Sequence, residues 1–449
     1  MNSLLVVNIC IVLSHILILV NITTAKKAKD ALFTRHVLTC LYTPRRVKTC
    51  NNILSTYTQC NEYHVRKICI VSFILEYNIR FSFIMCKDNL YATTLLLFYT
   101  RGGTRLRDSG SCKYLGGIDP KNKRCHKDKV KFKKLPHECS AYIYDGMNCT
   151  STYQILPRYS TTDLENIRSL IDLKGDDGEF HDVYTFYVHE TIQDFGEAIF
   201  IENGEAEAQG VKKFIGDYPV KGLILGGIDK PIIFEAGDDF HKNFTAYVRT
   251  IKTVNPGLEI GFYLSARYLT QVSINGDSSI WYDFVKMNDV LDFYLIEFTT
   301  FNECVNELLQ GGITPIDSLD KGILTLNKFA DAFKNCTIDK EKVYFEFLIN
   351  PKVMTKIRNT FFLCEISYNE YCENHKNYDF MWCVDTQDML YEKGKFAKQY
   401  SKGFVGSEID LVDRDNKCKC DNKYITFYMM LRGYNNEDPL TCDAYARPT

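Results

Sequence analysis

The feature that most constrains the fold of this chain is a regular alternation of short apolar runs with segments whose apolar residues recur at helical spacing. The apolar runs, which we expect to form strands, lie at 92–100, 141–144, 183–188, 222–228, 258–264, 291–298, 343–348 and 425–431. The helical segments lie between them at 163–174, 210–218, 240–251, 280–287 and 323–333. Strands that alternate with amphipathic helices favour a parallel sheet. Eight such strands over about 350 residues predict an α/β protein with a (β/α)8 (TIM) barrel.

The amino terminus has the pattern of a secretory signal peptide. Residues 1–25 contain the apolar run 4–20 and end in the small residues Thr23-Thr24-Ala25. The alternative is an uncleaved membrane anchor, because the run approaches the lower length for a span. We therefore expect a secreted, extracellular protein. Three Asn-x-Thr tripeptides would then be glycosylation acceptors, at Asn148, Asn243 and Asn335.

Cysteine content indicates disulfides. The chain has 18 cysteines, and 17 remain once Cys10 leaves with the signal, so one thiol stays free or pairs between chains. Residues 26–90 carry five of them at regular intervals, namely Cys40, Cys50, Cys60, Cys69 and Cys86. The absence of Cys-x-x-Cys pairs argues against a zinc site there. The spacing predicts a small Cys-rich N-terminal module of unidentified fold, with two strands within 68–85.

Charge is divided unevenly along the chain. Residues 26–135 hold 23 Lys and Arg against 7 Asp and Glu, whereas the whole chain has a net charge of -2. The run 101–135 alone carries 12 basic residues. It is either a solvated loop or a surface for an anionic polymer such as an acidic polysaccharide or lipid headgroups. Nucleic acid is not expected, because aromatic residues are not interleaved with the basic ones.

A buried strand that ends at Gly226-Gly227 lies near the middle of the chain. The stretch Val-Lys-Gly-Leu-Ile-Leu-Gly-Gly-Ile-Asp-Lys-Pro at 220–231 resembles the fourth barrel strand of the chitinases of glycoside hydrolase family 18, whose motif is Phe-Asp-Gly-x-Asp-x-Asp-x-Glu. The motif glycine is kept as Gly222. The four acidic positions of the motif are occupied, in order, by Lys221, Ile224, Gly226 and Ile228.

Other segments are similar to the same family, in the same order. Residues 137–144 resemble its second strand, 311–315 and 338–343 its approach to strand seven, 366–372 its inserted small domain and 431–442 its chain end. The resemblance covers about residues 91–445. It implies a chitinase-like barrel over 91–445, with a small α+β domain inserted after strand seven at 351–420.

The replaced motif residues determine the expected activity. In the family, as the resemblance implies, the motif Glu protonates the glycosidic oxygen and the neighbouring Asp steadies the N-acetyl group that attacks the sugar. Ile228 has no proton to give and Gly226 cannot orient an amide. The family's third-strand Ser-x-Gly-Gly falls on residues 186–189, its sixth-strand Met-x-Tyr-Asp on 297–300 and its sugar-floor Trp on Leu431. The sequence therefore predicts a catalytically inactive protein that binds chitin, another N-acetylglucosamine glycan or a protein partner.

Two rival functions remain open. The first is an active glycosidase with a relocated acid, built from Asp229, Glu297 or Glu346, because barrel active sites gather at the ends of the strands. The second is an extracellular interaction protein led by the basic N-terminal region. Aromatic side chains that could stack on a sugar, although such residues are more often core, are Tyr99, Tyr144 and Trp382.

The remaining predictions concern ligation and cross-linking. His189-Glu190 is not a metal site without a second histidine nearby, and no cofactor is expected. The resemblance implies a disulfide between Cys372 and Cys442. Cys139 keeps its family position, but its first-strand partner is replaced near Phe98, so Cys86 or Cys112 is its expected partner.

Overall fold

The computed structural model describes four strands between residues 55 and 98, and then residues 109–115, 131–158, 162–176, 178–200, 204–228, 240–275, 282–309, 311–354, 367–369, 371–373 and 382–442. The chain divides into two compact units, Met1–Thr104 and Arg105–Thr449. Each unit is described by itself. None of the helices in the described segments has the length and apolar content needed to cross a bilayer.

The first unit contains a four-stranded antiparallel sheet. Its strands pair in chain order, β1 (Ser55–Tyr63), β2 (Arg66–Ile74), β3 (Arg80–Cys86) and β4 (Leu97–Phe98). The two strands expected within 68–85 are therefore confirmed. The assignment of 92–100 to the barrel is wrong, because β4 pairs with β3. A short apolar run specifies a strand but does not specify which sheet it joins, and the boundary between the units falls at 104/105 rather than 90/91.

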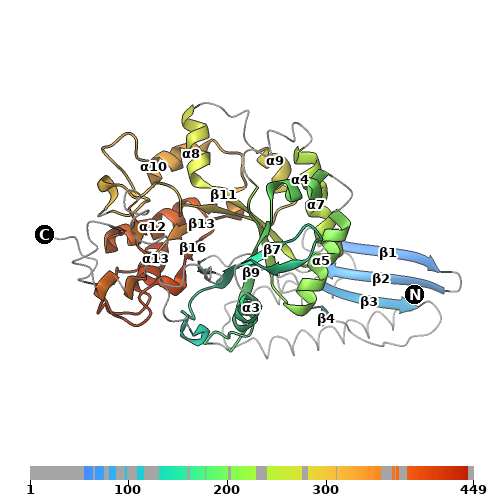
Figure 1. Ribbon diagram of the computed structural model, residues 1–449. Helices are drawn as coiled ribbons and strands as arrows, with labels where there is room; N and C mark the ends of the chain where they lie inside the picture. Colours follow the sequence, from blue (N-terminus) through green and yellow to red (C-terminus); the bar gives the residue numbers. More distant parts are fainter. Residues whose placement is uncertain are drawn as a thin grey trace, which may run out of the picture. The chain divides into compact units, whose positions relative to one another are not determined.

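The second unit is a closed barrel of eight parallel strands (Figure 1). The strands are β5 (Gly110–Leu115), β6 (Ala141–Asp145), β9 (Asp182–His189), β10 (Gly222–Leu225), β11 (Glu259–Ser265), β12 (Phe293–Glu297), β13 (Val343–Leu348) and β16 (Gly403–Ser407). Each strand pairs with the next in parallel, and β16 pairs with β5, which closes the ring. The predicted (β/α)8 barrel is confirmed.

Helices surround the barrel, as its strand order requires. They are α3 (Asp163–Ile171), α4 (Ile192–Phe200), α5 (Gly204–Asp217), α7 (Phe240–Val254), α8 (Ala266–Asn275), α9 (Phe284–Asn288), α10 (Leu326–Lys334), α12 (Gln387–Tyr400) and α13 (Ile425–Asn435). A hairpin of β7 (Met147–Cys149) and β8 (Ile155–Pro157) follows β6, and β7 also pairs with β9. A second small ladder joins β14 (Lys352–Val353) to β15 (Trp382–Cys383).

The eighth barrel strand is not the one that the sequence predicts. Residues 425–431 form the first part of helix α13, and β16 closes the barrel instead. A Cβ on Gly394 of α12 would lie 2.0 Å from the carbonyl oxygen of Met430, so close contact between these two helices determines the local structure. The predicted insertion 351–420 is consequently too long, because α12 and β16 belong to the barrel.

Glycines in the strands make room for aromatic rings inside the barrel. A Cβ on Gly222 would lie 2.5 Å from the carbonyl oxygen of Glu259 and 2.8 Å from the ring of Tyr184. A Cβ on Gly261 would likewise overlap the ring of Phe293. The interior core consists of Ala141, Ile143, Tyr184, Phe186, Ile224, Phe293, Leu295, Tyr344 and Val405. The motif glycine at 222 is thus explained by packing.

Disulfides differ in part from those expected. The described bonds are Cys112–Cys139, Cys304–Cys383, Cys372–Cys418 and Cys420–Cys442. The Cys112 alternative for Cys139 is confirmed, and the Cys372–Cys442 bond is wrong. Near the chain end, the Asp413 carboxylate accepts the backbone N–H of Lys417 and of Cys418. Cys418 and Cys420 lie in and beside this turn. Cys372 bonds to Cys418 and Cys442 bonds to Cys420, so the two cysteines that we expected to pair each have another partner.

Candidate functional site

The fourth strand is followed by apolar residues and glycine rather than by acidic residues. Ile224 of β10 lies in the interior core, and a Cβ on Gly226 would contact Phe186 and Val188 at 3.4 Å. Ile228 is 5% exposed, and its carbonyl oxygen accepts the Tyr282 hydroxyl at 2.6 Å. Lys221, at the opposite end of the strand, pairs with Glu259 at 3.3 Å. None of these four positions offers a carboxyl group to the mouth of the barrel.

A buried lysine occupies the interior beside this strand. Lys113 projects from β5, and its Nζ lies 3.0 Å from Glu346 Oε1 and 3.3 Å from Asp145 Oδ2. The same ammonium group lies over the Phe186 ring, 4.2 Å from its centroid, and 5.5 Å from the centroid of Tyr263. Since Tyr263 belongs to β11, which faces β5 across the ring, the lysine side chain reaches across the barrel.

Two glutamates stand next to each other at the carboxyl ends of adjacent strands. Glu297 of β12 and Glu346 of β13 are partners in the parallel ladder, and both are buried. Glu346 binds Lys113, whereas Glu297 accepts hydrogen bonds from Thr299 Oγ1 at 2.6 Å and from Thr300 N at 3.1 Å and Oγ1 at 2.5 Å. The two carboxyl groups are therefore already engaged by different partners.

Burial and neighbouring charge shift the ionisation of this group. Burial by itself lowers the pKa of Lys113, but the charges of Glu346 and Asp145 outweigh it and hold that pKa above its usual value. Burial raises the pKa of Glu346, and the positive charge of Lys113 opposes this rise. Burial and the surrounding carboxylates also hold the pKa of Tyr263 well above its usual range. Lys113 is thus a permanently charged group paired with two carboxylates. We call Lys113, Asp145 and Glu346 the Lys113 network.

The other predicted ligand-binding residues that the structure describes, Tyr144 and Trp382, are both buried. Tyr144 is fully buried, and its hydroxyl donates to Asp163 Oδ1 at 2.5 Å. Trp382 is buried in the β14–β15 ladder. Tyr99 and Asp229 lie outside the described residues. Of the predicted sites, the structure brings together Glu297 and Glu346.

Sequence reasoning missed the residue at the centre of this arrangement. Lys113 falls within the basic run 101–135, which the sequence assigns to a solvated loop or an anion-binding surface. That assignment is wrong for β5, where Lys113 is buried, although Lys131, Lys133 and Lys134 are exposed. The available signal was the apolar Cys-Lys-Tyr-Leu context of Lys113, which is that of a strand.

The three glycosylation acceptors differ in exposure. Asn335 is exposed, whereas Asn148 and Asn243 are partly buried. Asn148 also lies within β7, between β8 and β9.

A second cluster of chemically active side chains lies on the outer face of β9. Cys149, His189 and Glu207 come together there, each of them buried. The structure thus supplies His189 with neighbours other than a second histidine, and these come from β7 and α5.

Comparison with known proteins identifies the fold class. No known sequence family and no curated protein matches the chain by sequence. Among solved structures, catalytic domain 2 of the Group II chitinase of Ostrinia furnacalis matches 74% of this chain and 98% of its own, at 14% identity. Its TM-score is 0.57, or 0.59 for a glutamate-to-leucine variant.

Two further chitinases have the same architecture. The Group IV chitinase of the same insect matches 73% of this chain and 99% of its own, at 11% identity and a TM-score of 0.54. A glutamate-to-glutamine variant of a class V chitinase from Nicotiana tobaccum matches 73% and 98%, at 8% identity and a TM-score of 0.50. The chain is therefore a (β/α)8 barrel. More narrowly, it has the fold of the family 18 chitinases.

Proposed function

We propose that this chain is a secreted, chitinase-like protein that binds N-acetylglucosamine-containing glycans without hydrolysing them. The observation that carries the proposal is the end of the fourth strand. Ile224, Gly226 and Ile228 occupy the positions that the family resemblance gives to acids. Ile224 and Ile228 are buried among apolar residues, and Gly226 has no side chain. A group that cannot ionise cannot donate a proton to a leaving oxygen.

The Lys113 network supports the same proposal. A general acid needs a carboxyl group that can reach the substrate and exchange its proton. Glu346 is fully buried and bound to Lys113, and Glu297 accepts three hydrogen bonds from its own loop. Burial raises the pKa of Glu346 and the charge of Lys113 opposes this rise, but the ion pair with Lys113 keeps the carboxyl group away from a substrate.

Structures with the same fold support a glycan as the ligand class. The glutamate-to-leucine variant of the Ostrinia furnacalis domain is described in complex with penta-N-acetylchitooctaose, and the Nicotiana tobaccum variant with NAG4. Replacement of a glutamate is thus compatible with oligosaccharide binding in this fold. A second support is Tyr268, an aromatic residue that is 46% exposed in the first turn of α8, directly after β11. Loops at that end of a barrel form its binding site.

Two assays on the secreted full-length chain test the proposal. The first measures the rate at which the fluorophore is released from a fluorogenic chitotriose substrate. We expect this rate not to exceed the rate in buffer alone. The second measures binding to N-acetylglucosamine oligomers by calorimetry and glycan array, and we expect saturable binding. Absence of glycan binding would refute the ligand assignment and leave a protein as the partner to seek.

Matched substitutions locate the binding surface. Tyr268→Ala removes an aromatic face beside the mouth, so we expect it to weaken oligomer binding. Phe180→Ala removes a ring of similar exposure, 51%, from the connection before β9, at the opposite end of the barrel, and we expect no effect. Equal loss in both variants would contradict binding at the mouth.

The adjacent glutamates favour one rival function, a glycosidase with a relocated acid. Glu297 and Glu346 provide a carboxylate pair at the carboxyl ends of the strands. If the wild-type chain releases the fluorophore, and Glu297→Gln or Glu346→Gln abolishes that release with folding intact, the rival is correct. Turnover that survives both substitutions would exclude this pair.

A further inference from the structure

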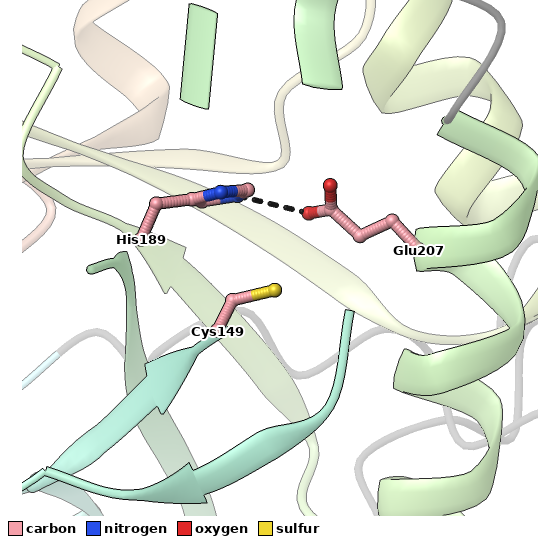
Figure 2. A group of neighbouring side chains, drawn as sticks. All are labelled: Cys149, His189 and Glu207. Carbon is pink, nitrogen blue, oxygen red and sulfur yellow. Dashed lines mark hydrogen bonds and ion pairs between the residues drawn. The ribbon is translucent and has the colours of Figure 1, made fainter. Parts of the chain in front are cut away.

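Three potential metal ligands from three separate elements meet on the outer face of the barrel. Cys149 ends β7, His189 ends β9, and Glu207 lies in the first turn of α5. One ligand atom from each residue lies within 4.8 Å of the others (Figure 2). His189 Nε2 is 3.1 Å from Glu207 Oε1. The pairing of β7 with β9, which places Cys149 opposite His189, fixes two of the three ligands.

All three side chains are removed from solvent. The side chains of His189 and Glu207 are 2% and 0% exposed, and Cys149 is fully buried. Cys149 is also one of two cysteines without a disulfide among those described. Full burial excludes access of a substrate to the sulfur, so a Cys-His-Glu nucleophile is not the use of this cluster.

The hydrogen bonding of the cluster is incomplete. Glu207 Oε1 accepts the hydroxyl groups of Tyr187 at 2.6 Å and Tyr247 at 2.5 Å in addition to His189. Glu207 Oε2 and His189 Nδ1 have no hydrogen-bond partner. A buried carboxylate with three donors at one oxygen and none at the other is unusual, because a buried polar atom that is left unpaired loses its hydration without compensation. An ion bound to the carboxylate would offset this loss.

The surroundings hold the ligands in position. Tyr187 and Tyr247 orient the Glu207 carboxylate, and the His189 ring packs edge to face against Tyr187 and Phe195. Hydrogen bonds to ligating carboxylates, and a dry aromatic shell, are typical of the groups that surround protein metal sites.

We propose that Cys149, His189 and Glu207 form a binding site for one divalent metal ion, and that this ion is zinc or a metal with the same ligand preferences. Sulfur, imidazole nitrogen and carboxylate oxygen are the ligand types that zinc accepts, and three protein ligands leave the fourth tetrahedral position for a water. In a tetrahedral zinc site, ligand atoms lie about 3.3–3.8 Å from one another. The His189–Glu207 separation is close to this range, and the three ligand atoms all lie within 4.8 Å of one another.

Charge balance favours a divalent ion over a monovalent one. Cys149 binds as a thiolate after loss of its S–H proton to solvent, and Glu207 binds as a carboxylate, while His189 stays neutral. Two negative ligands and a doubly positive ion give a neutral group, which is the arrangement that a buried site tolerates best. Without the ion, burial raises the pKa of the Cys149 thiol to about 12 and keeps it protonated.

Metal analysis of the full-length chain tests the proposal. The protein is incubated with zinc, freed of loosely held metal by gel filtration, and its zinc content is measured by mass spectrometry. We expect Cys149→Ser to hold one zinc ion per chain fewer than the wild type. The matched control is Cys336→Ser, which removes the other unpaired cysteine of the described region. Both substitutions keep an Asn-x-Thr acceptor intact, so differences in glycosylation do not confuse the comparison.

Two further measurements separate ligation from folding. Glu207→Gln keeps an oxygen for the two tyrosine hydroxyls but removes the charge, and we expect zinc affinity to fall by more than about 100-fold. Cobalt substitution should give a thiolate-to-metal absorption band in the wild type and Cys336→Ser, and none in Cys149→Ser. Equal zinc content in Cys149→Ser and the wild type, or a wild-type cobalt spectrum without that band, would overturn the proposal.

Discussion

The structure makes its sharpest prediction for the substitution Lys113→Met. Methionine keeps much of the hydrocarbon stem that lies against Phe186 and Tyr263, and it removes only the charge. Glu346 then loses its bonded cation at 3.0 Å and remains fully buried. Asp145 loses its ion pair with Lys113 at 3.3 Å. It remains partly exposed to solvent, and the Arg158 guanidinium lies 3.9 Å away.

The magnitude follows from these distances. At an effective dielectric constant of about 20, unit charges 3.0–3.3 Å apart attract by about 5 kcal/mol. Part of this is recovered in the variant, because burial of the lysine charge is no longer required. Removing one partner of a buried pair costs about 3–5 kcal/mol in measured cases. We expect Lys113→Met to lower the free energy of unfolding by this amount at neutral pH.

The loss depends on pH, and its sign follows from the pKa of Glu346. Lys113 stays charged throughout the acidic and neutral range, because its folded-state pKa is raised. Glu346 has a folded-state pKa above its unfolded value, and loss of the lysine raises it further. A carboxyl group with a raised pKa binds more protons when folded, so stability falls as pH rises from its unfolded pKa to its folded pKa. The variant should therefore be closest to the wild type near pH 5 and furthest from it near pH 8.

The assay is denaturant unfolding followed by far-ultraviolet circular dichroism at these two pH values. The double substitution Lys113→Met with Glu346→Gln should recover part of the loss, because it removes the uncompensated charge as well. The control is Lys334→Met, which breaks an exposed pair with Asp331 and should leave the unfolding midpoint unchanged. A loss below about 1 kcal/mol, the value for exposed pairs, or a loss that does not vary with pH, would refute the reasoning.

Three further predictions concern stability and covalent structure. Tyr144→Phe removes the hydroxyl that donates to buried Asp163 and should cost about 1.5–3 kcal/mol in thermal unfolding without altering glycan binding. A loss of glycan binding without a loss of stability would contradict this structural role and give the Tyr144 hydroxyl a part in binding. Gly394→Ala should cost about 1–3 kcal/mol, because its Cβ would lie 2.0 Å from Met430 O. Gly196→Ala, in a helix with no atom near the new Cβ, should instead stabilise the chain by about 0.5–1 kcal/mol, and equal effects in the two would contradict the packing argument. Peptide mapping without reduction should recover the bonds Cys112–Cys139, Cys304–Cys383, Cys372–Cys418 and Cys420–Cys442, and a Cys372–Cys442 peptide would count against the structure.

Elements with a strong local pattern could be predicted from the sequence. The strand expected at 343–348 is β13 with the same bounds, and the helix expected at 240–251 is α7, which ends three residues later at Val254. These elements are specified by the spacing of their own apolar residues, which is visible without knowing their neighbours. The barrel class followed because several such elements alternate in order.

Elements whose state depends on distant partners were predicted wrongly. The run 425–431 has the composition of a strand, but Gly394 and Gly433 allow α12 and α13 to pack closely as helices. The Gly-Phe-Val-Gly-Ser strand β16 has little local strand signal. It becomes a strand because it fills the gap between β13 and β5, which belong to opposite ends of the barrel sequence.

The sequence by itself determined that the fourth strand and the residues directly after it carry Ile224, Gly226 and Ile228, none of which can ionise, because side-chain chemistry is independent of the fold. Only the tertiary structure decided what surrounds them. Lys113 meets Glu346 across 233 residues, Cys149 meets His189 through the pairing of β7 with β9, and Glu207 joins them from α5. Such contacts depend on how the barrel closes and how its helices pack, and a linear pattern does not record which distant residues that closure brings together.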